Sequence, residues 1–235
     1  MNFSPQEEVM YRVMEAIYNS NIPINFKGSM VLKAFLVESG YVKDTRHTVD
    51  IDANWNSDEP PSTEAIARAL QNAISSYSDN YKVLVIRQYA QGRSAGFAVK
   101  DRSSNEELFT MDIDVNKPLP ETKLYEISGI KFSGFSPAQM VADKICVISK
   151  DKIFRRVKDL VDLFYLTQVS DLDKNQVLNI IAKGTEQLGD FDAFLNRTQE
   201  LEHSYSKFRF DGSVSKPNFN EVYTSVKEYV SKFII

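Results

Sequence analysis

The chain has 235 residues, of which 43% are hydrophobic, and its formal net charge at neutral pH is −4. This length suits one large domain or two small ones, and the apolar content is enough for an ordinary globular core. This charge gives no indication of a protein that coats nucleic acid, although it is compatible with a local basic groove. The single cysteine, Cys146, excludes an intrachain disulfide and a multi-cysteine zinc site.

The sequence shows no feature of a membrane or secreted protein. Its first five residues lack the basic and apolar regions of a secretory signal. No apolar run approaches the roughly 18 residues that are needed to span a bilayer. We therefore expect a cytoplasmic protein without membrane partners.

The first part of the chain is predicted to mix helices and strands. Apolar side chains at helical spacing predict helices over residues 5–19, 29–39 and 63–76. Pro60 and Pro61 stop the chain before the third of these, which Ser62 or Thr63 can cap. Alternating patterns between turn residues predict strands over residues 47–55, 81–89, 95–100, 108–115 and 125–133.

The pattern changes at residue 136. Ser136, Pro137 and Gln139 occupy the N-cap, first and third positions of a typical helix start. From there the spacing predicts only helices, over residues 137–149, 154–168, 173–187, 190–209 and 218–233. We therefore expect an α+β protein, with a mixed sheet and flanking helices over residues 1–135 and a helical bundle over residues 136–235.

Two aspartates lie two positions apart on the strand predicted over residues 47–55. Asp50 and Asp52 alternate with apolar Val49 and Ile51, so both carboxylates point to one face, about 7 Å apart. Carboxylates held this close repel each other unless a cation lies between them. The alternative is a solvent-facing strand edge without a ligand.

A second predicted strand repeats this pattern with Asp112 and Asp114. If the two strands are neighbours, three carboxylates can converge on one face of the sheet. Three carboxylates are enough to hold two divalent cations with oxygen ligands, and Mg²⁺ is the cation that best suits them.

Gly28 and Ser29 come directly before the helix predicted over residues 29–39. Backbone N–H groups at the start of a helix bind phosphate, and the serine hydroxyl adds a donor. A Gly-Ser pair alone is usually a cap or a turn. Ahead of the paired aspartates, it predicts a cradle for the β- and γ-phosphates of a nucleoside triphosphate.

The helical part contains its own charged pattern. Asp159 and Asp162 share one face of a predicted helix, and Lys144 lies on the helix that begins at residue 137. Arg155 and Lys158 each precede one of these aspartates by four residues, so intrahelical ion pairs are an alternative explanation. Lys144 could equally be a surface lysine.

The ordered set of motifs resembles the DNA polymerase β-type nucleotidyltransferases. The set comprises Lys27-Gly28-Ser29, then Arg46-x-Thr48-x-Asp50-x-Asp52, then the second carboxylate strand. Asp143-Lys144 and the segment from Arg155 to Leu163 narrow the resemblance to the AbiEii/AbiGii nucleotidyltransferase toxins of bacterial abortive-infection systems. The resemblance runs from about residue 25 to residue 166. The spacing between Ser29 and Asp50 is somewhat long for the superfamily.

The resemblance implies an enzyme that transfers a nucleoside monophosphate from an NTP to an acceptor hydroxyl. The residues that it assigns are Asp50, Asp52 and Asp112 as catalytic ligands of Mg²⁺ or Mn²⁺, Lys144 and Asp159 as further catalytic residues, and Gly28, Ser29, Arg46 and Lys144 as nucleotide-binding residues. It favours Asp112 over Asp114 and leaves the role of Asp162 open.

The resemblance also implies partners. These are an NTP, an RNA acceptor such as tRNA, and a separately encoded antitoxin. Two alternatives remain open at the level of the sequence: a transferase for a small molecule, like the aminoglycoside nucleotidyltransferases, and a nucleotide-binding protein without turnover.

Overall fold

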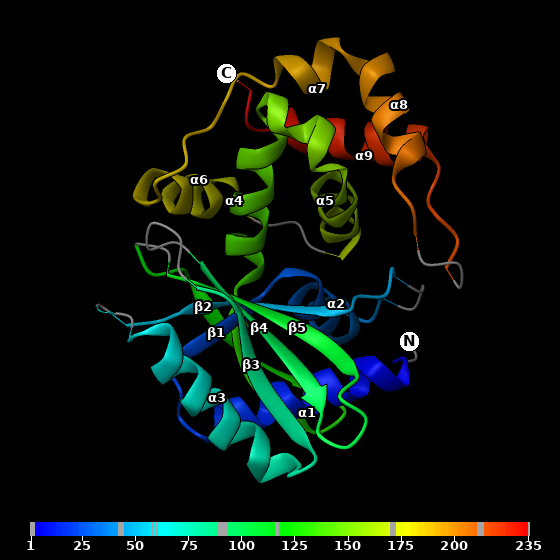
Figure 1. Cartoon of the computed structure of the whole chain (residues 1–235). Helices are drawn as coiled ribbons and strands as arrows, with labels where there is room; N and C mark the ends of the chain where they lie inside the picture. The colour runs from blue at the N-terminus through cyan, green and yellow to red at the C-terminus, as the bar shows by residue number, and fades with distance from the viewer. Residues whose placement is uncertain are drawn as a thin grey trace. The chain divides into compact units, whose positions relative to one another are not determined.

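The computed structural model describes residues 3–41, 45–57, 59, 61–88, 94–115, 118–169, 173–210 and 214–234. The chain forms two compact units (Figure 1). Unit 1 comprises Met1–Glu38 and His47–Phe135, and unit 2 comprises Ser39–Arg46 and Ser136–Ile235. The short segment 39–46 is therefore grouped with the C-terminal helices, whereas the sequence pattern predicts a single boundary after residue 135.

In its described residues, unit 1 is built on a mixed seven-stranded sheet. Its elements in chain order are α1 (Pro5–Asn19), β1 (Ile24–Lys27), α2 (Gly28–Glu38), β2 (Asp50–Trp55), α3 (Thr63–Tyr77), β3 (Tyr81–Arg87), β4 (Ser94–Asp101), β5 (Glu107–Asp114), β6 (Thr122–Ile127) and β7 (Ile130–Phe135). The strand order is β3-β4-β5-β2-β1-β7-β6. The pairs β2·β5 and β1·β7 are parallel, and the other neighbours are antiparallel.

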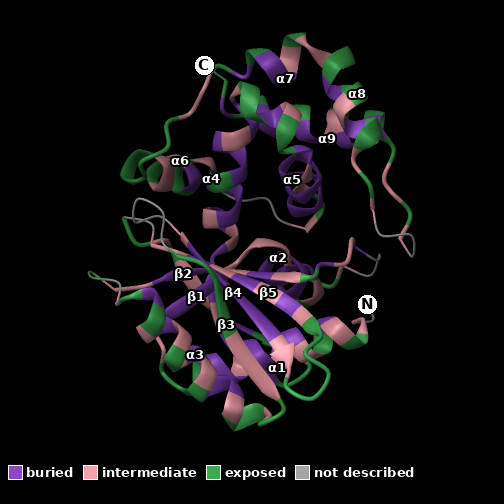
Figure 2. Cartoon of the chain, viewed as in Figure 1, coloured by how far each residue is buried: buried purple, intermediate pink, exposed green. Residues whose placement is uncertain are grey.

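One face of this sheet is apolar and packs against the helices. Phe26 and Ala53 are Cα partners in β1 and β2, and both are fully buried. The Phe132 ring of β7 lies 6.0 Å from the ring of Phe26 and 5.9 Å from that of Tyr11 in α1. The Tyr11 hydroxyl donates a hydrogen bond of 2.8 Å to the carbonyl of Met30, which ties α1 to α2. Figure 2 shows the resulting buried core.

Two features of unit 1 differ from the predicted elements. Strand β1 was not predicted, because its four residues are too few to show an alternating pattern. The single strand expected over residues 125–133 is a hairpin of β6 and β7. Its turn lies at Ser128 and Gly129, whose φ angles of 51° and 77° are the positive values that tight hairpin turns require.

In the part of the chain that the structure describes, unit 2 contains helices and no strand. Its elements are α4 (Pro137–Ile148), a 3₁₀ helix η1 (Asp151–Arg155), α5 (Val157–Val169), α6 (Lys174–Lys183), α7 (Asp192–Asn196), α8 (Thr198–Lys207) and α9 (Phe219–Val230). The predicted α+β class, with a mixed sheet followed by helices, is confirmed. None of the described helices has the length and apolar character needed to cross a membrane.

The helix boundaries in unit 2 follow local signals. The Ser136 hydroxyl accepts a hydrogen bond of 3.1 Å from the N–H of Gln139, so the predicted cap of α4 is confirmed. The single helix expected over residues 190–209 is broken into α7 and α8 at Arg197, whose φ and ψ of −112° and 43° are not helical. Helical periodicity continues across this break, which explains why the pattern alone did not reveal it.

A buried ion pair joins α1 to α2 in unit 1. Lys33 Nζ donates to both carboxylate oxygens of Glu7 at 2.8 Å, and the two side chains are 3% and 0% exposed. The N–H of Ser4 donates to the same carboxylate at 2.9 Å, and His47 Nδ1 lies 3.0 Å from it. Burial opposes ionisation of Glu7, but the bonds from Lys33 and Ser4 outweigh it and lower the pKa of Glu7.

Replacing Lys33 by Met is expected to lower the free energy of unfolding by about 3–5 kcal/mol, because Glu7 would stay buried without its cation. A lowered pKa means that ionised Glu7 stabilises the fold fully above the unfolded pKa of about 4.3, and this stabilisation is lost as the pH falls through the folded value. Urea unfolding at pH 7 and at about pH 3 measures both effects. The double variant Glu7→Gln, Lys33→Met should regain most of the loss, and a single variant as stable as the wild type at pH 7 would contradict the prediction.

Candidate functional site

Charged side chains form a row across the polar face of the unit 1 sheet. Asp52 of β2 and Asp112 of β5 are Cα partners in neighbouring parallel strands. Asp52 is also the antiparallel partner of Lys27, the last residue of β1. Because paired residues of adjacent strands point to the same face, these three side chains lie side by side.

Asp50 lies on the same face as Asp52. It begins β2 two positions before Asp52, and both residues are partly exposed, whereas Ile51 and Ala53 are fully buried on the other face. The hydroxyl of the buried Thr48 donates a hydrogen bond to Asp50 Oδ1. The two carboxylate-bearing strands are thus neighbours, and they bring Asp50, Asp52 and Asp112 onto one face.

The two aspartates of β5 have different surroundings. Asp114 is the Cα partner of Asn54 and accepts a hydrogen bond from Lys27 Nζ. Asp112 is the partner of Asp52 and accepts a hydrogen bond of 2.9 Å from Arg87 Nη2. The register therefore favours Asp112 as the β5 carboxylate that can act together with Asp52.

Gly28 brings the backbone against the Asp52 carboxylate. Strand β1 ends at Lys27 and helix α2 begins at the next residue, with a φ of +72° at Gly28. A Cβ atom at this position would lie 2.4 Å from Asp52 Oδ2. Ser29 follows in the first turn of α2, where backbone N–H groups lack intrahelical acceptors. The predicted phosphate cradle and the first carboxylate strand therefore lie next to each other in unit 1.

Replacing Gly28 by Ala is expected to destabilise unit 1 and to displace the Asp52 carboxylate. Gly129→Ala is a matched control, because Gly129 has a φ of +77° but no atom within 4 Å of the added Cβ. The control should lose about 1–2 kcal/mol from the positive φ, whereas Gly28→Ala should lose about 2 kcal/mol more from the contact with Asp52. Urea unfolding of both variants measures the difference. Equal losses would show that the contact with Asp52 carries no cost.

The donor set suits a hard divalent cation, although the carboxylates have other partners in this structure. Among the described residues, no three His, Cys, Asp or Glu side chains are grouped closely enough to hold a metal ion. Asp112 is instead bonded to Arg87. The residue types nevertheless fit, since carboxylates in register supply oxygen ligands. Glycines lie beside both paired carboxylates, Gly28 at Asp52 and Gly96 at Asp112.

Unit 2 contains a second charged cluster, around Lys144 of α4. Lys144 Nζ donates to Asp159 Oδ1 at 3.0 Å and to Asp162 Oδ2 at 2.9 Å, both from α5. The Arg46 guanidinium lies 3.4 Å from Asp162 Oδ1, and Arg156 Nε donates to Asp159 Oδ2 at 2.7 Å. Both aspartates and the lysine are buried. The partners of the aspartates are therefore Lys144, Arg46 and Arg156.

Mutual attraction keeps this buried cluster charged. Burial raises the pKa of Asp159, but Lys144 and Arg156 outweigh it and lower the pKa below its usual value. Burial acts in the same way on Asp162, and there Lys144 and Arg46 lower the pKa. Burial lowers the pKa of Lys144, yet the two aspartates raise it well above its usual range. All three groups are therefore ionised at neutral pH.

Several of these partners were not found from the sequence. The intrahelical pairs considered for Asp159 and Asp162, with Arg155 and Lys158, are replaced by the pairs with Lys144, Arg156 and Arg46. Arg46 is 116 residues from Asp162, a distance over which no local pattern can pair them. Arg87 and Gly96 are further neighbours of Asp112. Only the strand register brings them to this carboxylate.

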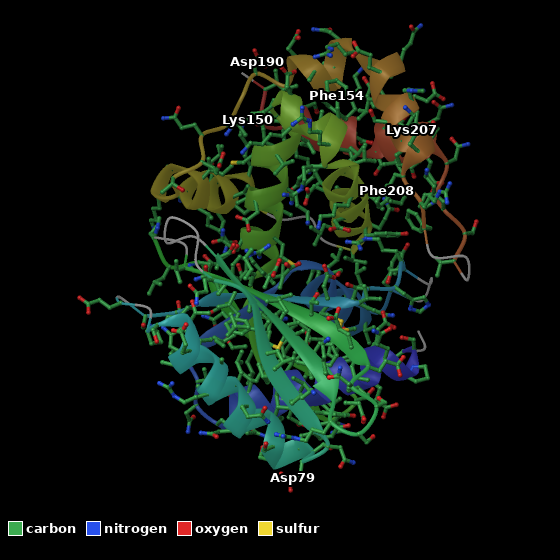
Figure 3. All side chains as sticks on the ribbon, viewed as in Figure 1. Asp79, Lys150, Phe154, Asp190, Lys207 and Phe208 are labelled. Carbon is green, nitrogen blue, oxygen red and sulfur yellow. The ribbon has the colours of Figure 1, made fainter. Side chains whose placement is uncertain are left out.

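An open pocket of about 440 Å³ lies elsewhere on unit 2. Phe154, labelled in Figure 3, lines it together with residues of α8, among them Glu200 and His203. None of the residues predicted for the site belongs to this pocket.

Comparisons with known proteins show a family match and a similar fold. Residues 12–223 match the family model described as nucleotidyl transferase AbiEii toxin, type IV TA system. The chain is similar in structure to MenT4, a nucleotidyltransferase toxin from Mycobacterium tuberculosis H37Rv, with a TM-score of 0.60 and 15% sequence identity. The similarity covers 95% of this chain and 80% of the MenT4 chain. It is also similar to an antigenic nucleotidyltransferase-like protein from Paracoccidioides brasiliensis, with a TM-score of 0.51, 13% identity, and coverage of 89% and 95%. At these identities the two structures support the fold alone. No curated protein sequence matches the chain significantly.

Proposed function

This chain belongs to the AbiEii nucleotidyltransferase toxin family, whose model spans residues 12–223. From this premise we propose that the protein transfers a nucleoside monophosphate from an NTP to a hydroxyl group of RNA. We propose tRNA as the class of acceptor. The observation that carries the proposal is the register of Asp52 with Asp112 on the polar face of the sheet, with Asp50 two positions away. The family further implies a cognate antitoxin as a partner.

The carboxylates are the proposed ligands of a divalent metal ion. Asp50, Asp52 and Asp112 would hold Mg²⁺ or Mn²⁺, for which carboxylate oxygens are suitable ligands. When bound, such ions stabilise the charge that develops on the triphosphate and on the leaving pyrophosphate. Asp112 would exchange its bond with Arg87 for this role, and Thr48 would keep Asp50 oriented.

The start of α2 is the proposed phosphate site. Its first-turn N–H groups and the Ser29 hydroxyl supply donors, and the helix dipole favours an anion at this end. Gly28 supports this assignment because it lets the backbone pass against Asp52 without a side chain. Phosphoryl transfer depends mainly on positioning and charge stabilisation, which these groups can provide without a covalent intermediate.

The unit 2 cluster is proposed to take part through its charge. We propose Arg46 and Lys144 as nucleotide-binding residues and Asp159 as the carboxylate that orients Lys144. Lys144 and Arg46 are cationic side chains bonded to the same carboxylate, that of Asp162. Cationic side chains attract a polyphosphate. Asp162 is proposed to hold Arg46 and Lys144 in place.

Incubation of the full chain with each α-labelled NTP, Mg²⁺ and total tRNA tests the function. Label on RNA supports the proposal. Label on a small molecule alone supports an antibiotic-type transferase, and nucleotide binding without transfer supports a non-catalytic protein. The double variant Asp50→Ala, Asp52→Ala is the control, and transfer by this variant would refute the assignment of the carboxylates.

A further inference from the structure

Arg87 is the cationic residue of unit 1 that donates a hydrogen bond to Asp112. We propose that Arg87 is a positioning residue that holds Asp112 in the metal-free enzyme and competes with a divalent cation for this carboxylate. The proposal rests on the proposed function, in which Asp112 is a metal ligand.

A β-bulge places Arg87 where it can reach Asp112. Val85 of β3 is the partner of Phe97 in β4, but the register then shifts and Arg87 is the partner of Gly96. Two residues, Ile86 and Arg87, thus lie opposite one. Bulges of this kind redirect a side chain and are frequent next to active sites.

Gly96 leaves space for the Arg87 side chain to cross β4. It is the Cα partner of Arg87 on one side and of Asp112 on the other. A Cβ atom at Gly96 would lie 3.2 Å from Arg87 Cβ and 3.3 Å from Asp112 Oδ1. Without this side chain, the guanidinium crosses the strand and Nη2 donates to Asp112 Oδ1 at 2.9 Å.

Fold stability does not account for this arrangement. The Arg87 and Asp112 side chains are 50% and 46% exposed, and ion pairs this exposed contribute little to stability. A bulge and a strand glycine both weaken the sheet where they occur. The bulge and the glycine therefore serve the placement of the guanidinium rather than the stability of the sheet.

The guanidinium of Arg87 offsets negative charge where two carboxylates are adjacent. Asp52 and Asp112 are side by side, and two such charges repel each other without a cation between or beside them. Arg87 offsets the charge of Asp112 while no divalent ion is bound. A cation that binds Asp112 must displace this guanidinium and act against its charge, so the removal of Arg87 should tighten cation binding.

Binding of Mn²⁺ to the full chain tests the proposal without a measurement of activity. The variants are Arg87→Gln, Arg87→Lys and Asp112→Asn, and the control is Lys82→Gln, which removes the same charge from the same strand. Lys82 is bonded to Asn105 and not to a carboxylate of the row. Electron paramagnetic resonance of free Mn²⁺ gives the dissociation constant of Mn²⁺ from each variant and from the wild type.

We expect Arg87→Gln to bind Mn²⁺ roughly three- to tenfold more tightly than the wild type, as the loss of one charge a few ångströms away predicts. Arg87→Lys should stay closer to the wild type, because the charge remains. Lys82→Gln should change the constant less than twofold, and Asp112→Asn should weaken binding by about tenfold.

Two results would overturn the proposal in different ways. If Asp112→Asn weakens Mn²⁺ binding but Arg87→Gln does not tighten it, the competition is refuted while the metal assignment stands. If Asp112→Asn leaves the affinity unchanged, Asp112 is not a ligand, and the metal assignment of the proposed function fails together with the role of Arg87.

Discussion

Replacing Asp52 by Asn is expected to lower the rate constant for nucleotidyl transfer by about a thousandfold, the loss that follows removal of a central electrostatic group from a transition state. Asp52 is the partner of Asp112 and Lys27 in register, and it lies against Gly28. Because Asp52 lies on the polar face and is partly exposed, the free energy of unfolding should change by less than about 1 kcal/mol.

The two aspartates of β5 provide a matched comparison for this effect. Asp112→Asn should also lower transfer by about a hundredfold or more. Asp114→Asn, on the same strand and face, should retain at least a tenth of the activity, because Asp114 is bonded to Lys27 and registers with Asn54. Initial rates at saturating NTP and Mg²⁺ measure all three variants. A larger loss for Asp114→Asn than for Asp112→Asn would reverse the assignment.

Replacing Lys144 by Met is expected to lower the free energy of unfolding of unit 2 by about 3–5 kcal/mol. The variant would leave two buried carboxylates with only Arg46 and Arg156 as partners. Lys152→Met is the control: Lys152 is 60% exposed and lies 3.5 Å from Glu186, so its loss should cost less than about 1 kcal/mol. Urea unfolding followed by circular dichroism measures both.

The pH dependence of this cluster follows from the directions of the pKa shifts. The pKa values of Asp159 and Asp162 are lowered, so their stabilisation is complete above about pH 5 and is lost as the pH falls through the folded values. The pKa of Lys144 is raised, so its stabilisation is present below its unfolded pKa of about 10.4 and is lost only above it. The stabilisation that the wild-type cluster contributes should therefore be constant from about pH 5 to 10, as urea unfolding of the wild type at several pH values would measure.

A second variant separates stability from nucleotide binding. Lys144→Met combined with Asp162→Asn removes one buried carboxylate together with the lysine, so most of the stability should return. If Lys144 binds nucleotide as proposed, this double variant should fold but show a KM for NTP about tenfold or more above the wild type. Recovery of both stability and KM would assign Lys144 a structural role only.

Local patterns in the sequence were sufficient for most helices and for the alternation of Asp50 and Asp52. Helix starts depend on neighbouring residues, as the cap at Ser136 shows, and the faces of a strand depend on a period of two residues. The same local reasoning missed the four-residue strand β1 and the hairpin turn at Ser128. In both places the signal was too short to outweigh the pattern around it.

The sequence by itself determined the α+β class, the family motifs and the alternation that places the aspartates of each strand on one face. Only the tertiary structure decided which aspartates are partners. Strand β2 pairs with β5 in a register that makes Asp112, and not Asp114, the Cα partner of Asp52. It also paired Asp162 with Arg46 and brought Arg87 to Asp112 across Gly96. The physical reason is that strand order, register and bulges depend on contacts between residues far apart in the chain, whereas helix caps and side-chain periodicity depend on neighbours.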